Sequence, residues 1–259
     1  MRGLQGRSAL ISSGAQGIGK AVAARLTEEG SNVMIMDVND EFGHSTVEEL
    51  TRRASVGRVL FVHGDIADEA DVVAAVEATR GAFGGVELLV NCAAALIMRG
   101  VDATVDEWRR VTDVNIMGHA LMVKHAAPLI EAAGGGSVVN VSSISAHIAQ
   151  PRFLTYSATK AAIIGMTRCM AHDLADAGIR VNAVSPGTVW TDNLARSYKN
   201  KYGLSREGAD AHPDIGGRHL LRRAADPEEI ASAVVFLLSS DASFITGENL
   251  MVDAGYTVV

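Results

Sequence analysis

The chain is poor in cysteine, in basic charge and in proline, and each shortage excludes a class of protein. Its 259 residues include two cysteines, Cys92 and Cys169, far apart in apolar segments, which excludes a disulfide framework and indicates a reducing compartment. Lysine and arginine number 23 against 30 acidic residues, so a net charge of −7 leaves no basic face for nucleic acid. Five prolines and an apolar content of 48% exclude a disordered chain.

No apolar run is long enough for a transmembrane helix. The longest uncharged stretch, residues 132–151, is interrupted by three consecutive glycines, by Asn140 and by several serines. Only residues 1–7 precede the first strand-like run, which leaves no room for the apolar core of a signal peptide. We therefore expect a soluble, cytoplasmic protein without a membrane partner.

Short apolar runs alternate with longer segments of helical period along the chain. In residues 18–29, apolar side chains recur at positions i, i+3, i+4 and i+8, which is typical of an amphipathic helix. Several short runs are apolar without alternation, as in strands that helices cover on both faces. This pattern predicts an α/β fold in one domain, residues 1–259, with strands near 9–12, 33–36, 59–62, 87–90, 137–141, 180–184 and 249–252.

Residues 192–223 interrupt this alternation. They contain four glycines and seven basic against four acidic side chains, and such a long, irregular segment predicts either a lid over a site or a disordered excursion. Because the segment follows the carboxyl end of a strand, we expect a substrate lid. Its basic excess is consistent with an anionic substrate or with a solvated loop.

A glycine-rich turn follows the first predicted strand, in the sequence SGAQGIG at residues 13–19. Glycines there allow a tight turn and a close backbone approach to a pyrophosphate at the start of the next helix, whose free N–H groups favour an anion. A glycine-rich turn alone is weak evidence, since glycines cluster in any tight loop. The predicted phosphate contacts are Gly14, Gln16, Gly17, Ile18 and Gly19.

An acidic residue ends the second predicted strand at a spacing that suits an adenosine ribose. Asp37 lies 18 residues after Gly19, and no lysine or arginine stands at positions 15, 16 or 38 to attract a 2′-phosphate. The carboxylate therefore predicts NAD rather than NADP, although a turn residue at a strand end would look the same. After the third strand, Asp65 and Ile66 are expected at the adenine, with a helix N-cap as the alternative for Asp65.

A tyrosine and a lysine stand four residues apart on one face of a predicted helix. The phenol of Tyr156 has a reference pKa of about 10 and needs a nearby cation to act as acid or base near neutral pH, which Lys160 supplies. Ser143, at the end of the fifth predicted strand, can donate a hydrogen bond to a substrate oxygen as negative charge develops on it. These residue types predict acid–base chemistry at a substrate oxygen.

Taken together, these motifs resemble the short-chain dehydrogenase/reductase family. The resemblance covers nearly the whole chain in order and at family spacing, through SGAQGIG (13–19), NCAA (91–94), Asn115, Ser143, YSATK (156–160) and SPGTVWT (185–191). Two departures occur: Ser13 replaces the usual threonine, and NCAA replaces NNAG. We interpret both as tolerated, because the serine keeps a hydroxyl group and the family varies at the second motif.

The resemblance implies a role for each candidate residue. By it, Tyr156 is the acid/base, Lys160 lowers the pKa of Tyr156 and holds the nicotinamide ribose, and Ser143 positions the substrate. Asn115, inside a predicted helix, would hold a water that links Lys160 to solvent. The further implied cofactor contacts are Asn91 and, at the nicotinamide, Pro186, Gly187 and Thr191.

We therefore expect a Rossmann-type fold, with seven parallel strands in the order 3-2-1-4-5-6-7 and helices on both faces. The expected reaction is reversible hydride transfer between NAD and a secondary alcohol such as a sugar, a polyol or a cyclic alcohol. The resemblance also implies a homotetramer, whose interface could include the apolar segment 256–259. Candidate residues of the substrate pocket are Ala95, Leu96, Ser145, His147, Gln150, Phe153 and Trp190.

Other chemistries fit the residues less well. The eight histidines are scattered without His-Glu-x-x-His or Cys-x-x-Cys spacing, so we expect no metal. Gly-x-Ser-x-Gly is absent, which argues against a serine hydrolase. Two alternatives stay open: an NADPH-dependent 3-ketoacyl-thioester reductase, disfavoured by Asp37, and a non-catalytic NAD sensor, disfavoured by the retained Tyr156 and Lys160.

Overall fold

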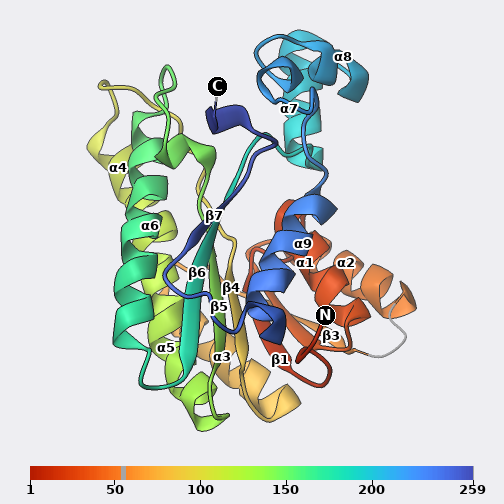
Figure 1. Cartoon of the computed structure of the whole chain (residues 1–259), viewed down its shortest axis with the longest axis vertical. Helices are drawn as coiled ribbons and strands as arrows, with labels where there is room; N and C mark the ends of the chain where they lie inside the picture. Colours follow the sequence, from red (N-terminus) through yellow and green to blue (C-terminus); the bar gives the residue numbers. More distant parts are fainter. Residues whose placement is uncertain (54–56, 259) are drawn as a thin grey trace.

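Seven parallel strands form one sheet in the computed structural model of the chain, which describes residues 1–53 and 57–258 (Figure 1). The strands are β1 (Ser8–Ser12), β2 (Asn32–Asp37), β3 (Val59–His63), β4 (Leu88–Asn91), β5 (Gly136–Val141), β6 (Ile179–Pro186) and β7 (Asn249–Val252). Their order across the sheet is β3-β2-β1-β4-β5-β6-β7, so the predicted fold class and strand order are confirmed.

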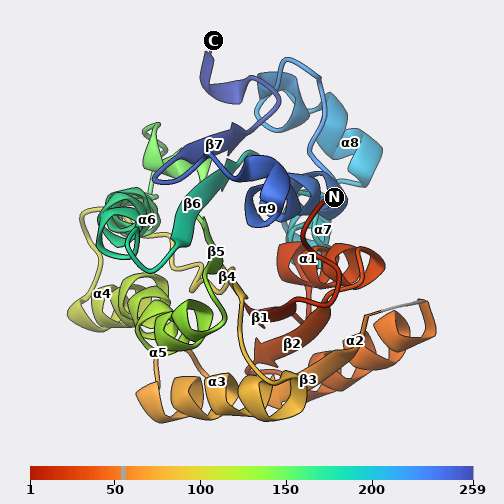
Figure 2. The ribbon, with the colours of Figure 1, turned by 60° about the horizontal axis from the view of Figure 1, so that its bottom comes forward.

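Helices cover both faces of the sheet, and Figure 2 shows the two layers on opposite sides of the strands. One layer holds α1 (Gly17–Glu28), α2 (Asp40–Arg53) and α9 (Pro227–Leu238), and the other holds α3 (Glu69–Phe83), α5 (His119–Ala132) and α6 (Leu154–Asp173). The other helical segments are α4 (Val105–Thr112), α7 (Asp192–Tyr202), α8 (Arg206–Ala211), a π-helical turn (Asp113–Gly118) and short 3-10 turns at Ile144–Ala146, Gly216–Arg218, Ser240–Ala242 and Tyr256–Val258. Within residues 1–53 and 57–258, no helix is long and apolar enough to span a membrane.

The inner strands of the sheet are buried because they lie between two helix layers, whereas the edge strands β3 and β7 are mostly half-buried. All five residues of β1 and all four of β4 are buried, which explains why their sequences, SALIS and LLVN, do not alternate between apolar and polar. The carboxyl ends of all seven strands meet at one edge of the sheet, since every pairing is parallel. Ligands bind at this edge in open α/β sheets.

The predicted lid is helical rather than irregular. α7 begins after Thr191 and α8 after Ser205, and each hydroxyl accepts a hydrogen bond from a backbone N–H in the first turn of its helix. A bridge between Val189 and Ala225 closes the base of the segment, so that it leaves and rejoins the body at one place. In Figure 1, α7 and α8 stand together at the top of the molecule.

The C-terminal segment folds back onto the body of the protein. The Tyr256 ring lies edge-on to the His219 ring, with 5.1 Å between the ring centroids. Val259, the last residue of the segment 256–259 expected at an interface, lies outside the described residues. The place of this segment in an interface stays a prediction.

Candidate active site

The glycine-rich turn joins β1 to α1, and its shape depends on residues with little or no side chain. Ser13 and Gly17 adopt left-handed backbone conformations, with φ of 55° and 53°. A Cβ on Gly19 would lie 2.0 Å from the carbonyl oxygen of Ser13, so the turn packs directly on the helix. Gln16, the N-cap of α1, makes no capping hydrogen bond with its side chain, which leaves the first N–H groups of the helix facing outward. The turn, which also holds Gly14 and Ile18, therefore fits a pyrophosphate.

A cavity of about 130 Å³ opens beside this turn. Its lining includes Asp37, Asp65 and Ile66, the three residues predicted at the adenosine, which come from the carboxyl ends of β2 and β3. Residues 93–95, which follow β4, form another part of the wall. The fold thus brings together residues that were assigned to one ligand from their spacing, and their contact with a cofactor stays a prediction.

The Asp37 carboxylate is held by backbone groups. Its Oδ2 accepts a hydrogen bond from the Ala15 N–H at 3.2 Å, and its Oδ1 accepts one from the Asn39 N–H at 3.1 Å. In the part of the chain that the structure describes, no lysine, arginine or histidine forms an ion pair with Asp37. The Asp37 carboxylate therefore keeps its negative charge at the cavity wall without an ion-pair partner among the described residues.

Arg110 also lines the cavity, although nothing in its sequence context marks it. From α4, its Nη2 donates to Oδ2 of Asp65 at 3.0 Å, while Oδ1 of Asp65 accepts the Ala67 N–H at 2.9 Å. The Asp65–Arg110 ion pair spans 45 residues of sequence. Only the folded chain brings the two side chains together, so no local pattern could have identified it.

The Asn91 side chain has a structural role at the end of β4, and the contact of this residue with a cofactor stays a prediction. Its side chain is fully buried and turned into the sheet, where its amide donates to the Asn140 Oδ1 at 2.9 Å and to the His119 carbonyl oxygen at 3.3 Å. The Asn91 side chain therefore holds neighbouring elements together and does not reach the cavity. The residues that follow it, 93–95, line the cavity instead.

The predicted catalytic residues converge from β5 and α6. Ser143 follows the end of β5, and its Oγ accepts the Ser145 N–H at 3.1 Å, which leaves the hydroxyl proton for another partner. Tyr156 lies in the first turn of α6, where its phenol is close enough to the Ser143 side chain for that group to affect its pKa. One turn further along, the Lys160 ammonium donates to the Val141 carbonyl oxygen at 2.8 Å and lies 5.6 Å from the centre of the Tyr156 ring.

Burial dominates the proton affinities of this group. It raises the pKa of Tyr156 to about 12, against the effect of the neighbouring Ser143 side chain, which lowers it. It also lowers the pKa of Lys160 to about 8, because an ammonium group is costly to bury. In the protein alone, burial sets the direction of the Tyr156 shift, and a lowering of this pKa by Lys160 stays a prediction.

Asn115 lies in the π-helical turn between α4 and α5 and is fully buried. Its Oδ1 accepts the Ala95 N–H at 2.7 Å, and its Nδ2 donates to the Ala95 carbonyl oxygen at 3.2 Å and to the Thr159 hydroxyl at 3.0 Å. The side chain therefore fastens the loop after β4 to α6, beside Lys160. The implied water between Asn115 and Lys160 stays a prediction.

The three residues implied at the nicotinamide lie where β6 ends. Gly187, directly after Pro186, packs so closely that a Cβ would lie 3.0 Å from the Asp253 Cα atom. Thr191 caps α7 and touches the glycine-rich turn, since a Cβ on Gly17 would lie 3.1 Å from the Thr191 methyl carbon. Two motifs far apart in sequence thus meet at the carboxyl edge of the sheet.

The candidate residues of the substrate pocket fall into three groups. Ala95 is held by Asn115, and its neighbour Leu96 is exposed. Near Ser143, the Ser145 hydroxyl donates to the Gln150 Oε1 at 2.6 Å, while the exposed His147 is turned to β7 and contacts Asn249. The aromatic members each meet another ring: Phe153 lies 6.2 Å from Tyr156, and Trp190 lies 6.0 Å from Tyr198 of α7.

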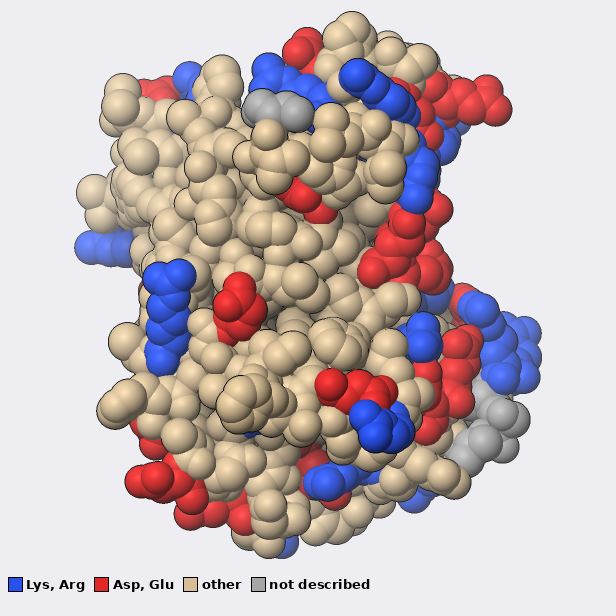
Figure 3. All heavy atoms as spheres, viewed as in Figure 1, with Lys and Arg blue, Asp and Glu red and all other residues tan. Residues whose placement is uncertain are grey.

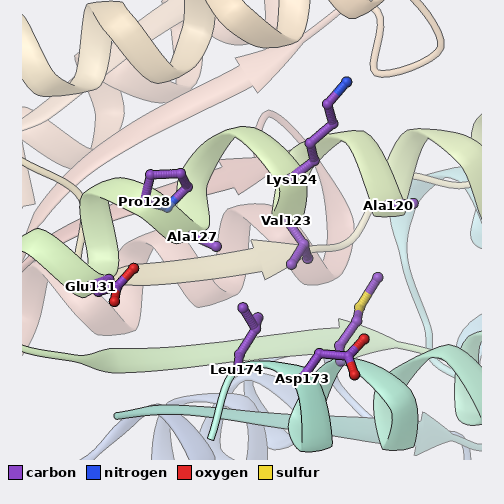
Figure 4. Close-up of a pocket in the computed structure, with 9 residues that line it drawn as sticks. Ala120, Val123, Lys124, Ala127, Pro128, Glu131, Asp173 and Leu174 are labelled. Atoms are coloured by element: carbon purple, nitrogen blue, oxygen red, sulfur yellow. The ribbon is translucent and has the colours of Figure 1, made fainter. Parts of the chain in front are cut away.

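A larger hollow, about 380 Å³, lies away from these residues, between α5 and α6 (Figure 4). Figure 4 shows Lys124 and Glu131 of α5 and Asp173 of α6 around an apolar floor that includes Val123 and Leu174. None of the predicted site residues lines this hollow. The candidate site therefore lies at the strand ends and not at this hollow.

Residues 14–257 match the family model described as enoyl-(acyl carrier protein) reductase. Over 263 aligned residues the chain is 36% identical to a 2,5-dichloro-2,5-cyclohexadiene-1,4-diol dehydrogenase of Sphingobium indicum, with the whole of both chains covered. It is 39% identical over 255 residues to a cis-4-hydroxycyclohexanecarboxylate dehydrogenase of Sinomonas cyclohexanicum, which covers 98% of this chain and 97% of the other.

A solved structure agrees with these relatives. The crystal structure of L-sorbose reductase from Gluconobacter frateurii, complexed with NADPH and L-sorbose, superimposes with a TM-score of 0.93 at 28% identity, over 99% of this chain and 98% of that one. The similarity extends over the glycine-rich turn, the strand ends and α6. The chain belongs to the short-chain dehydrogenase/reductase family and is a nicotinamide-dependent oxidoreductase that interconverts a secondary alcohol and its ketone.

Proposed function

We propose that the protein is an NAD-dependent dehydrogenase of a secondary alcohol carried on a six-membered ring. The observation that carries the proposal is the placement of Ser143, Tyr156 and Lys160 at the edge of the sheet that also holds the glycine-rich turn and Asp37. In this arrangement an acid–base group and a candidate dinucleotide-binding turn lie at neighbouring strand ends.

The preference for NAD rests on charge at the adenosine end. The Asp37 carboxylate would accept hydrogen bonds from the ribose hydroxyls and would repel a 2′-phosphate. Arg110, the cation on the same cavity wall, is already paired with Asp65 at 3.0 Å and so offers little compensation. The sorbose reductase structure contains NADPH, so a test of this proposal has to compare NAD with NADP.

For the cofactor, we propose that the pyrophosphate lies on the first N–H groups of α1 and that Asp65 and Ile66 lie at the adenine. At the other end, the Lys160 ammonium would hold the nicotinamide ribose, and the turn at Pro186, Gly187 and Thr191 would seat the nicotinamide. When bound, oxidised nicotinamide supplies the hydride acceptor. This placement is supported by the close approach of Gly17 and Thr191, since it brings the glycine-rich turn next to the turn after β6.

For the chemistry, we propose that Tyr156 exchanges the proton of the substrate oxygen. In the oxidative direction its phenolate accepts the hydroxyl proton while the hydrogen on carbon leaves as hydride. The Ser143 hydroxyl donates to the same oxygen, because its own acceptor site already receives the Ser145 N–H. Lys160 carries positive charge below a pH of about 8, where it favours the phenolate of Tyr156.

We propose the substrate class from the aromatic residues near the candidate active site and from the names of the related dehydrogenases. The Phe153 ring lies 6.2 Å from the Tyr156 ring, and Trp190 packs on Tyr198 at the start of the lid segment. We propose that both aromatic pairs line the substrate, which suits a ring more than an open chain. Both curated relatives are named for alcohols on six-membered rings. We infer that residues 192–223 form a lid over this substrate.

Two arginines near the base of the lid are already paired with acidic side chains, and on this ground we propose that a carboxylated ring alcohol gains little over a neutral one. Arg206 forms ion pairs with Asp210 and Asp226, and Arg223 pairs with Glu229, so these cations are already neutralised. A carboxylate on the substrate would have to compete with these acidic groups. We therefore expect no advantage for an anionic substrate.

An activity screen tests these proposals together. Cyclohexanol, cis-4-hydroxycyclohexanecarboxylate, sorbitol and a linear secondary alcohol would each be offered with NAD and with NADP, and reduction of the cofactor would be followed by absorbance. We expect the highest kcat/KM for cyclohexanol with NAD. Equal efficiency with NADP would refute the role of Asp37, and a clear preference for sorbitol would refute the ring substrate.

We further propose a homotetramer. The helix pair α5 and α6 presents the hollow in Figure 4, and the centre of the face in Figure 3 is largely uncharged, with the charged groups gathered toward its edges. Phe244, in the connection before β7, is fully exposed. Large exposed apolar side chains of this kind are typical of interfaces. Light scattering that reports a monomer at micromolar concentration would refute this proposal.

A cytoplasmic location is proposed from the cysteines. Cys92 and Cys169 are both free thiols, and burial raises the pKa of the Cys92 thiol to about 11, so it resists oxidation. Free thiols are typical of reducing compartments. Fractionation of cells that express the protein would test this, and recovery in a secreted fraction would contradict it.

A further inference from the structure

Three segments from distant parts of the chain meet at one buried histidine. His219, only 2% exposed, stands where the lid segment, residues 192–223, returns to the body. On one side of its ring lies the turn after β6, and on the other lies the C-terminal segment, whose Tyr256 ring packs edge-on at 5.1 Å between centroids. None of the roles proposed above uses this histidine.

The two ring nitrogens of His219 have different partners, which fixes its protonation. Nδ1 lies 3.0 Å from the Ile215 carbonyl oxygen, and because a carbonyl can only accept, Nδ1 carries the hydrogen. Nε2 is then an acceptor, and it receives the backbone N–H of Thr188 at 3.2 Å. Only the neutral ring with hydrogen on Nδ1 makes both bonds.

Thr188 belongs to the turn 186–191, and this turn leaves no room on the side of His219. A Cβ on Gly187 would lie 2.9 Å from the His219 Nε2 and 3.0 Å from the Asp253 Cα atom. The Thr188 carbonyl oxygen accepts the Ala225 N–H at 2.8 Å, so the next peptide group of the turn is tied to the base of the lid. His219 therefore supplies the side-chain contact that sets where the turn lies.

We propose that His219 is a positioning residue that holds the turn 186–191 in the conformation that binds the nicotinamide, and that it thereby couples the lid segment to the cofactor. The inference rests on the proposed role of this turn. His219 acts through Thr188 and needs no contact with the cofactor itself. The adenosine cavity, whose lining includes Asp37, Asp65 and Arg110 but no residue of this junction, should not respond to it.

Two substitutions separate the partners of the ring. The amide of His219→Asn reaches about as far as Nδ1, so it can donate to the Ile215 carbonyl oxygen but cannot reach Thr188. The longer His219→Gln places its Oε1 near the former Nε2, where it can accept the Thr188 N–H. Each variant therefore keeps one of the two hydrogen bonds: His219→Asn keeps the bond to Ile215, and His219→Gln keeps the bond to Thr188 that the proposal invokes.

Binding of NADH and of ADP-ribose, which lacks the nicotinamide, would be measured for each variant of the full chain. We expect His219→Asn to weaken NADH binding about three- to tenfold, the range for one lost hydrogen bond, and to change ADP-ribose binding less than about twofold. His219→Gln should recover most of the NADH affinity. Tyr256→Leu, which disturbs the same junction but keeps both hydrogen bonds of His219, should leave the ratio of the two affinities as in the wild type.

The pattern of losses decides the outcome. Equal weakening of NADH and ADP-ribose in His219→Asn, or a Tyr256→Leu variant with the same selective loss, would show a structural role only and overturn the inference. NADH binding at the wild-type level in His219→Asn would overturn it as well. A wild type that binds neither ligand would refute the proposed function and this inference with it, so the two failures are distinguishable.

Discussion

Replacing Lys160 with methionine measures how far the buried ammonium destabilises the folded protein. Lys160 is 2% exposed, and burial lowers its pKa from an ordinary value of 10.5 to about 8. At about 1.4 kcal/mol per pKa unit, keeping the charge below pH 8 costs the folded state about 3 kcal/mol. Methionine has a similar length without the charge, so the variant removes this cost at every pH.

The sign of the pH dependence follows from the number of bound protons. Below pH 8 Lys160 is charged in the folded and unfolded chain alike, and the cost of burial is complete. Between pH 8 and 10.5 the folded state has lost this proton while the unfolded chain keeps it, so wild-type stability rises with pH. From pH 7.5 to pH 9 this single group should add about 1 kcal/mol to the free energy of unfolding. Tyr156, whose pKa rises from 10 to about 12, acts only at higher pH and in the opposite direction.

Urea unfolding followed by tryptophan fluorescence at pH 7.5 and pH 9 would test this. The wild type should gain about 1 kcal/mol relative to Lys160→Met, a shift of roughly 0.3–1 M in the difference between their midpoints. Lys160→Met also loses the hydrogen bond to Val141. This loss changes the free energy of unfolding alike at both pH values, so it cancels in the comparison. Lys199→Met, at an exposed position of α7, serves as the control and should follow the wild type. If the free energy of unfolding changed by the same amount between pH 7.5 and pH 9 in Lys160→Met and in the wild type, the burial argument would be refuted.

Most of the sheet could be predicted because its inner strands are buried on both faces. Strands such as β1 and β4 are apolar throughout, and this pattern needs no knowledge of their neighbours. Strand ends are less evident: β6 was expected at 180–184 but runs from Ile179 to Pro186, since its last residues pair with β7. The end of a strand depends on where its partner ends, and the partner lies more than 60 residues away.

The helices of the lid show a different limit. The excess of glycine and charge in residues 192–223 suggested an irregular segment, yet Thr191 and Ser205 each cap a helix, and Gly203 ends the first one in a left-handed conformation. These capping residues are local signals and were available in the sequence. The composition of the whole segment does not reveal these capping residues, because their meaning depends on their positions and not on their number.

Within the site, residue identity could be predicted better than side-chain direction. Tyr156 and Lys160 share a helix face because of their spacing, and the structure keeps them together. Asn91 turns away from the cavity because Asn140 on the neighbouring strand accepts its amide hydrogen, a contact that no local pattern encodes. The proton affinity of Tyr156 was also beyond the sequence, because it depends on how much of the surrounding protein excludes water.

Three further predictions concern cofactor, chemistry and acid stability. Asp37→Ala should weaken NAD binding about tenfold and improve NADP binding, because it removes a ribose acceptor and a repulsive charge together; an unchanged ratio of the two dissociation constants would contradict this. Tyr156→Phe should lower kcat about 10²–10⁴-fold with NAD binding intact, and Ser143→Ala should lower kcat with little change in cofactor affinity; full activity in Tyr156→Phe would refute the mechanism.

The last prediction concerns His119, where burial and the nearby charge of Lys160 lower the pKa to about 3. Below pH 6.5 the unfolded chain takes up a proton on this histidine that the folded state refuses until about pH 3, so stability falls as the pH falls. By pH 4.5 the loss should reach about 2–3 kcal/mol, and His119→Leu should remove that part of it, whereas His172→Leu, on the exposed face of α6, should not. Urea unfolding at pH 7 and pH 4.5 compares the three proteins, and an acid-induced loss in His119→Leu as large as in the wild type would show that this histidine is not buried in its neutral form.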